Sequence, residues 1–252
     1  MPPPPDPTPD PLIETLKSLA RQADSRAIES SLAASDPRRA AEALSTAQLD
    51  LYWIHKDIPA VLILSHSGIA HLLKLAEQSP GDPSADAPGL PHFGHYAKAL
   101  AFNLASFTWP GWAEPGITLT PAHIAAGYQA ARLNLRLAEE LKRPEKAKAK
   151  AHWLLGAHQL SAAEFAPASD SFRTAKTHAA QTDDPLLPQM LDGYLLLAHL
   201  LTAPQNGEAR RDFDSAVTAL RNQASEDARE YATQLTSAFA VLWKSPNASP
   251  PR

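Results

Sequence analysis

The stretch AHWLLGAHQLSAAEFAPASDSFRTA, residues Ala151–Ala175, decides how this chain folds. Its second half places Phe165, Ala168, Phe172 and Ala175 at intervals of three, four and three residues. On an α-helix this spacing puts all four side chains on one face, where large residues alternate with small ones. Small residues let two helices approach closely and large ones fill the space beside them. The stretch therefore predicts a helix–turn–helix pair that packs against neighbouring pairs.

The same spacing recurs in two other segments of the chain. The upstream copy consists of Tyr128, Ala131, Leu135 and Ala138. The downstream copy consists of Phe213, Ala216 and Leu220, and Gln223 breaks its last position. A helical unit that recurs at such intervals predicts stacked hairpins, each of which buries its face on the next.

Residues 149–182 resemble a tetratricopeptide repeat. The resemblance rests on Leu155, Gly156, Ala163 and the series from Phe165, together with Trp153 one place from its expected position. Gln159 replaces the Tyr that is usual in the first helix, the usual Pro at the repeat end is missing, and the repeat spacing is irregular. The resemblance implies an all-α fold: a right-handed stack of antiparallel helix hairpins, a TPR-like α-solenoid, from about residue 95 to 244.

The rest of the chain is also predicted to be helical, because Leu and Ala recur at spacings of three and four residues. Asp10–Pro11, Asp36–Pro37 and Thr120–Pro121 are typical helix starts, with a capping side chain followed by Pro in the first turn. We predict a Pro-rich disordered tail, irregular N-terminal helices that pack on or extend the stack, the repeat region, and a second disordered tail. These four parts span residues 1–10, 11–90, 91–244 and 245–252.

Composition narrows the classes of function. The chain has no Cys, which excludes disulfides and thiolate metal sites and is consistent with a reducing cytoplasm. Its net charge of −4 gives no general attraction to nucleic acid or to an anionic membrane. The apolar runs IPAVLIL and GYLLLAHLL are shorter than the roughly 20 residues of a membrane span. We expect a soluble, cytoplasmic protein without a nucleic-acid or membrane partner.

Candidate catalytic and metal motifs are weak in this sequence. His66 and His71 are five residues apart, so they do not share a helix face cleanly. His92 and His95 have a spacing that could chelate a metal, but their segment supplies no further ligand. Residues Ser65–Gly68, SHSG, lie within a predicted helix and not on the strained elbow of a hydrolase nucleophile. We therefore predict no catalytic residue, no metal site and no cofactor.

The leading hypothesis is a non-enzymatic adaptor that binds a protein or peptide on the concave face of the stack. By the tetratricopeptide resemblance, the groove-facing positions are Lys150, Trp153, Ala157 and Leu160. They lack the paired Lys and Asn residues with which some relatives hold a C-terminal carboxylate, so the resemblance implies a rather apolar groove.

The motif TWPGW adds Trp109 and Trp112 as candidate partner-binding residues. If exposed, the two rings would form an anchor for a partner. We favour the interpretation that they plug the gap left by a long connection. Two other hypotheses stay open: an enzyme or small-ligand binder with a helical cavity lined by His66, His71 or His92, and a structural protein that self-associates.

Overall fold

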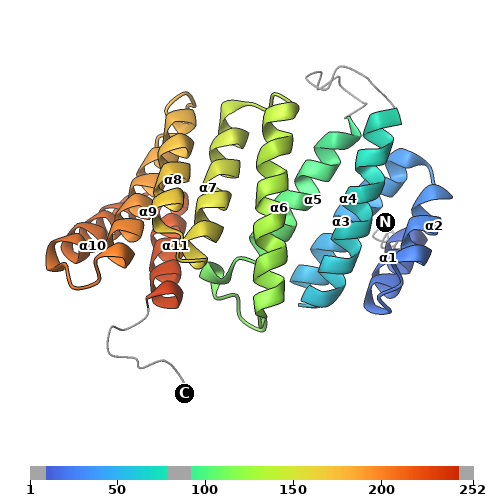
Figure 1. Cartoon of the computed structure of the whole chain (residues 1–252), viewed down its shortest axis with the longest axis horizontal. Helices are drawn as coiled ribbons and strands as arrows, with labels where there is room; N and C mark the ends of the chain where they lie inside the picture. Colours follow the sequence, from blue (N-terminus) through green and yellow to red (C-terminus); the bar gives the residue numbers. More distant parts are fainter. Residues whose placement is uncertain (1–9, 79–91, 244–252) are drawn as a thin grey trace, which may run out of the picture. The chain divides into compact units, whose positions relative to one another are not determined.

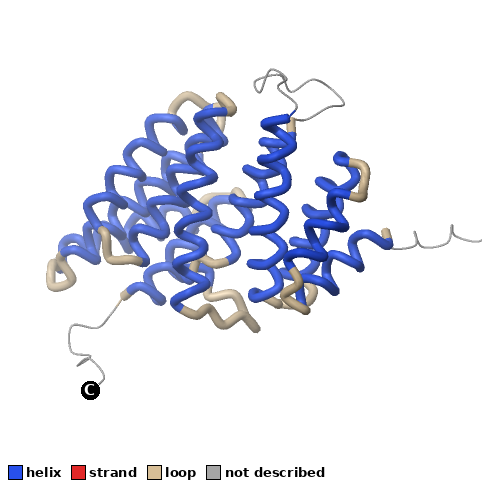
Figure 2. The backbone as a smooth tube through the Cα atoms, turned by 45° about the vertical axis from the view of Figure 1, so that its right-hand side comes forward, coloured by secondary structure: helices blue, strands red, loops and turns tan. Residues whose placement is uncertain are grey.

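The computed structural model describes residues 10–78 and 92–243. The predicted tail 245–252 lies outside these ranges, as does the predicted tail 1–10 apart from Asp10. Within the described ranges every regular element is a helix and no strand occurs (Figure 2). The prediction of an all-α fold is therefore confirmed.

Contacts between residues divide the chain into two units after Phe107. Unit 1 contains α1 (Pro11–Arg21), α2 (Ser25–Ala33), α3 (Pro37–Trp53), α4 (Ile58–Gln78) and α5 (Phe93–Phe107). Unit 2 contains the 3-10 helix η1 (Pro110–Trp112), α6 (Pro121–Glu140), α7 (Glu145–Ser161), α8 (Phe165–Ala179), α9 (Leu186–Thr202), α10 (Gly207–Arg221) and α11 (Glu226–Leu242). Helix α5 falls in the predicted repeat region 91–244, but it packs on α4 and belongs to unit 1.

Three helices begin where the sequence predicts. The Asp10 carboxylate accepts a hydrogen bond from the Leu12 amide at 2.8 Å before α1, and Asp36 accepts one from the Arg39 amide at 3.0 Å before α3. Thr120 caps α6 in a capping box. Each cap satisfies amide groups that have no partner inside the helix, and the following Pro has no N–H to leave unpaired.

Unit 1 is built around the apolar helix α4, which contacts α1, α2, α3 and α5. A buried polar group also fixes its interior: the Gln48 amide donates to the Ser65 hydroxyl at 2.8 Å and to the Leu100 carbonyl at 3.0 Å. The Asn103 amide in turn donates to the Gln48 side-chain oxygen at 3.0 Å. By length and composition alone α4 could span a membrane, although half of its most apolar window is buried within the structure.

Unit 2 consists mainly of helices that pack on their neighbours in chain order, from α6 to α11. Figure 1 shows α6, α7 and α8 side by side. Helix α11 departs from this order, because it packs on α9 and η1 as well as on α10. The Ser237 hydroxyl of α11 donates to the Gly111 carbonyl at 2.8 Å and lies 3.1 Å from the Trp112 carbonyl. The last helix of unit 2 is thus tied to its first segment.

Close packing of α7 on α8 follows the alternating series that the sequence shows. Ala168, Phe172 and Ala175 are fully buried, whereas Phe165 is only half-buried. A Cβ atom placed on Gly156 would lie 2.6 Å from Cε1 of Phe172. The absence of a side chain at Gly156 therefore lets the Phe172 ring sit directly on α7.

We expect Gly156→Ala to lower the free energy of unfolding by about 1–3 kcal/mol, because the added methyl group must displace a buried ring. Urea denaturation followed by circular dichroism measures the change. Gly207→Ala is the matched control: an added Cβ meets only the flexible end of Arg211 at 3.6 Å, so stability should change by less than about 0.5 kcal/mol. Equal stability of Gly156→Ala and the wild type would contradict the proposed packing constraint.

Candidate functional site

The TWPGW segment lies over α7 in unit 2. Trp109 is 1% exposed, and its indole N–H donates to the Ala157 carbonyl at 3.0 Å and lies 3.1 Å from the Ser161 hydroxyl. Trp112 is half-buried, with its ring 5.2 Å from that of Trp109. Trp109 is therefore buried in unit 2 and has almost no surface to offer a partner.

Three of the four predicted groove residues also belong to the core of unit 2. Trp153 is 6% exposed, Ala157 and Leu160 are buried, and only Lys150 is exposed. The Trp153 ring lies 5.9 Å from the rings of both Trp109 and Tyr194. The connection after Phe107 packs on α7 through η1, and it covers part of the face on which Trp153 lies.

The three histidines of the predicted ligand cavity are not gathered into a metal-binding group. His66 is exposed and His71 half-buried on α4, and His92 precedes α5, 6.2 Å from the ring of His95. In the part of the chain that the structure describes, a different group of potential ligands lies close enough together to hold a metal ion. It lies in unit 2 and consists of Glu139, His152 and His178.

This His–Glu cluster joins three consecutive helices. Glu139 lies in the last turn of α6, His152 lies in the middle of α7, and His178 is in the last turn of α8. One potential ligand atom from each residue lies within 4.8 Å of the others. The two imidazole rings stack at 5.4 Å with an angle of 15°, and Nε2 of His152 is 3.8 Å from Oε1 of Glu139.

A second carboxylate orients the cluster. Oε2 of Glu145 lies 2.5 Å from Nδ1 of His178, and Oε1 of Glu145 is 3.1 Å from Nζ of Lys148. The bond with His178 and then that with Lys148 lower the pKa of Glu145, so it is ionised at neutral pH. Burial, followed by the nearby His178, lowers the pKa of His152 and favours its neutral, metal-ligating form.

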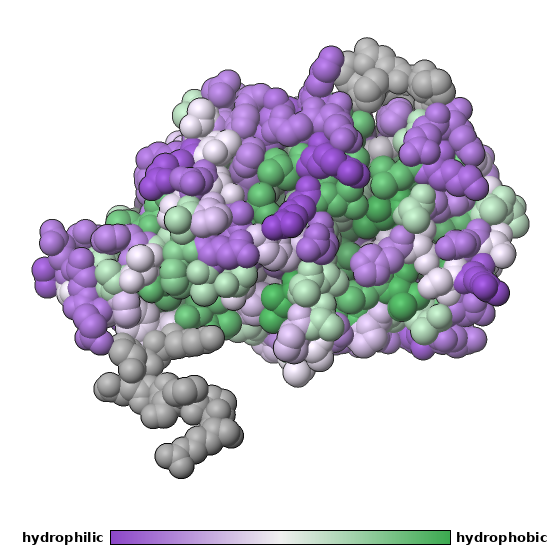
Figure 3. Space-filling view, in the orientation of Figure 1, coloured by the Kyte–Doolittle hydropathy of each residue, from purple (hydrophilic) through white to green (hydrophobic). Residues whose placement is uncertain are grey.

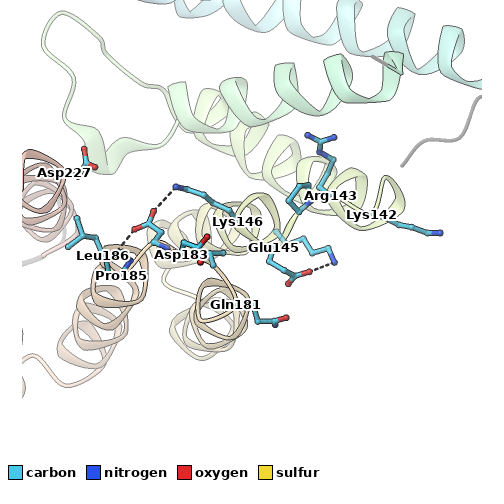
Figure 4. Close-up of a pocket in the computed structure, with 13 residues that line it drawn as sticks. Lys142, Arg143, Glu145, Lys146, Gln181, Asp183, Pro185, Leu186 and Asp227 are labelled. Carbon is cyan, nitrogen blue, oxygen red and sulfur yellow. Dashed lines mark hydrogen bonds and ion pairs between the residues drawn. The ribbon is translucent and has the colours of Figure 1, made fainter. Parts of the chain in front are cut away.

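An open groove lies beside this cluster, between the start of α7 and the connection from α8 to α9 (Figure 4). It has a volume of about 890 Å³ and both signs of charge on its walls. Lys146 pairs with Asp184 at 2.9 Å. Because Lys146 and Lys148 are neutralised by carboxylates, this end of α7 is not the uniformly basic surface that a polyanion needs.

Unit 1 carries the clearest exposed apolar surface. Four large apolar side chains are exposed in the described ranges, and three lie within six residues at the end of α3. We call them the Trp53 patch: Leu49, Trp53 and Ile54, of which Trp53 is 55% and Ile54 68% exposed. The Tyr52 and Phe107 rings support Trp53 edge-on from 4.7 and 6.2 Å. By contrast, the surface over α10 in unit 2 is hydrophilic (Figure 3).

Reasoning from the sequence missed both the cluster and the patch, although each has a weak local signal. Glu145, which orients the cluster, and His152, which belongs to it, are seven residues apart and so lie on the same face of a helix. Leu49 and Trp53 are four apart, which does the same on α3. Neither spacing reveals which partner helix, if any, faces the residues.

Comparison with known proteins adds no assignment. No protein-family model matches the chain, no curated protein matches it, and no solved structure matches it.

Proposed function

We propose that this chain is a non-enzymatic scaffold that binds a partner protein through the Trp53 patch. The observation that carries the proposal is the grouping of Leu49, Trp53 and Ile54, exposed together at one helix end. Exposed contiguous apolar side chains are typical of interaction sites, and Trp is among the residues most often responsible for binding energy.

The finer fold assignment, a TPR-like right-handed stack, is part of this proposal. It is supported by the chain-order packing of α6 to α10 and by the close approach of Gly156 to Phe172. Such stacks serve widely as binding surfaces because each hairpin adds area without changing the framework. The binding surface proposed for this chain differs from the concave face, since the face of α7 around Trp153 is covered.

The occupant that fits the Trp53 patch is an apolar segment of another protein, which would cover Trp53 and Ile54. The ammonium group of Lys56 lies 5.6 Å from the centroid of the Tyr52 ring and 5.3 Å from that of the Trp53 ring, so a cation–π contact borders the apolar surface.

Affinity capture from the native cell tests the proposal, with the wild type compared with Trp53→Ala. We expect a partner to be lost with Trp53→Ala, and its Kd, measured with purified proteins, to rise by about 30-fold or more. Val241→Ala is the matched control, because Val241 is exposed on α11 in unit 2 and its loss should leave binding unchanged.

Two outcomes would contradict the proposal. Capture of the same proteins by the wild type and by Trp53→Ala would show that the patch binds no partner. Light scattering that finds a wild-type dimer and a Trp53→Ala monomer, with no other protein captured, would assign the patch to self-association instead.

A further inference from the structure

We propose that Glu139, His152 and His178 form a binding site for a divalent transition-metal ion, for which zinc has the best-fitting chemistry. Two imidazoles and a carboxylate form a ligand set that zinc commonly uses when one coordination position is left for water or another ligand. The inference is independent of the Trp53 patch, which lies in the other unit.

The geometry needs little rearrangement to hold an ion. In tetrahedral zinc sites with bonds of about 2.0–2.2 Å, neighbouring ligand atoms are about 3.4 Å apart. Here the three ligand atoms are all within 4.8 Å of one another, and the pair from His152 and Glu139 is already 3.8 Å apart. Glu139 is exposed, so its side chain is free to move the remaining distance.

The imidazole ring of His178 is held by a contact at one of its two nitrogens. Its Nδ1 is paired with the Glu145 carboxylate at 2.5 Å, which leaves Nε2 available for the ion. A carboxylate that accepts the second ring N–H of a ligating histidine fixes the tautomer and raises the basicity of the ligand. Lys148 in turn holds Glu145 at 3.1 Å, so the outer layer of the site is itself anchored.

A network without metal is the competing explanation. The stacked imidazoles and the pair between His178 and Glu145 could serve only to join α7 to α8. That explanation gives Glu139 no necessary part, because its 3.8 Å separation from His152 is too long for a hydrogen bond. A metal ion, by contrast, requires Glu139, which makes this residue the most informative one to change.

The direct test is metal titration of the full, untagged chain after treatment with a chelator. Competition with a chromophoric chelator measures zinc binding, and cobalt(II) reports the coordination geometry through its visible absorption. We expect one zinc ion per chain and a cobalt spectrum of tetrahedral type. Absence of stoichiometric zinc binding would overturn the proposal.

Variants assign the ligands. His178→Ala and Glu139→Gln should each weaken zinc binding by about 100-fold or more, and Glu145→Gln, which alters only the orienting carboxylate, by about 10- to 100-fold. His199→Ala removes an exposed histidine of α9 and should change nothing.

Circular dichroism checks the fold of each variant. If His178→Ala fails to fold, Glu139→Gln decides the matter, since the Glu139 side chain is exposed and the change keeps its size. Zinc affinity that is unchanged in a folded Glu139→Gln or His178→Ala would place the ion elsewhere and refute the site.

Discussion

Replacing Trp109 with alanine is expected to lower the free energy of unfolding of unit 2 by about 3–5 kcal/mol. Among the described residues, Trp109 has the largest fully buried side chain. Its ring packs within 5.9 Å of Trp153 and 6.2 Å of Tyr194. The substitution leaves a cavity among these rings and also removes the indole donor to the Ala157 carbonyl.

Chemical denaturation followed by far-ultraviolet circular dichroism measures this loss. Trp53→Ala serves as the matched control, because Trp53 is 55% exposed. Apart from the loss of its ring contacts with Tyr52 and Phe107, this substitution should lower the free energy of unfolding by less than about 0.5 kcal/mol. If the two substitutions destabilise the chain equally, Trp109 is not the central packing residue that its burial indicates.

Phe172→Ala is expected to have an effect of similar size, about 3–5 kcal/mol. The Phe172 ring is fully buried, lies against Gly156 and approaches the Tyr194 ring at 5.1 Å. Because Gly156 has no side chain that could fill the vacated space, we expect the cavity to persist and the free energy of unfolding to fall by this full amount. Urea denaturation again provides the measurement.

Comparison with Phe165→Ala tests whether the effect of Phe172→Ala comes from the burial of the ring or from its place in the repeated series. Both residues belong to the series Phe165, Ala168, Phe172 and Ala175, but Phe165 is only half-buried. Its loss should therefore cost less than about half as much as that of Phe172. Equal losses at the two positions would mean that place in the series, and not burial, determines the contribution.

Local signals made much of the fold predictable. The Asp–Pro and Thr–Pro pairs predict the starts of α1, α3 and α6 because capping depends only on residues within one turn. The close approach at Gly156 also follows from sequence spacing, since a helix places residues three and four apart on one face.

The candidate sites depend on contacts between distant segments, which spacing does not reveal. Trp153 has the position of a groove residue, but it is buried because η1, about 40 residues upstream, packs on α7. Likewise Glu139, His152 and His178 come from three helices, and each is unremarkable within its own helix. Trp53 is the opposite case: an apolar residue on a helix face is expected in the core, but the structure shows that this side chain is 55% exposed.

The Ser237 hydroxyl, which donates to the Gly111 carbonyl and lies beside the Trp112 carbonyl, joins segments about 125 residues apart in sequence. An open array of repeats can grow or shrink by whole hairpins, because each hairpin depends only on its neighbours. Unit 2 lacks that freedom, since α11 contacts η1, α9 and α10 together. Insertion or loss of one hairpin would separate these surfaces, so we expect unit 2 to unfold as one cooperative body.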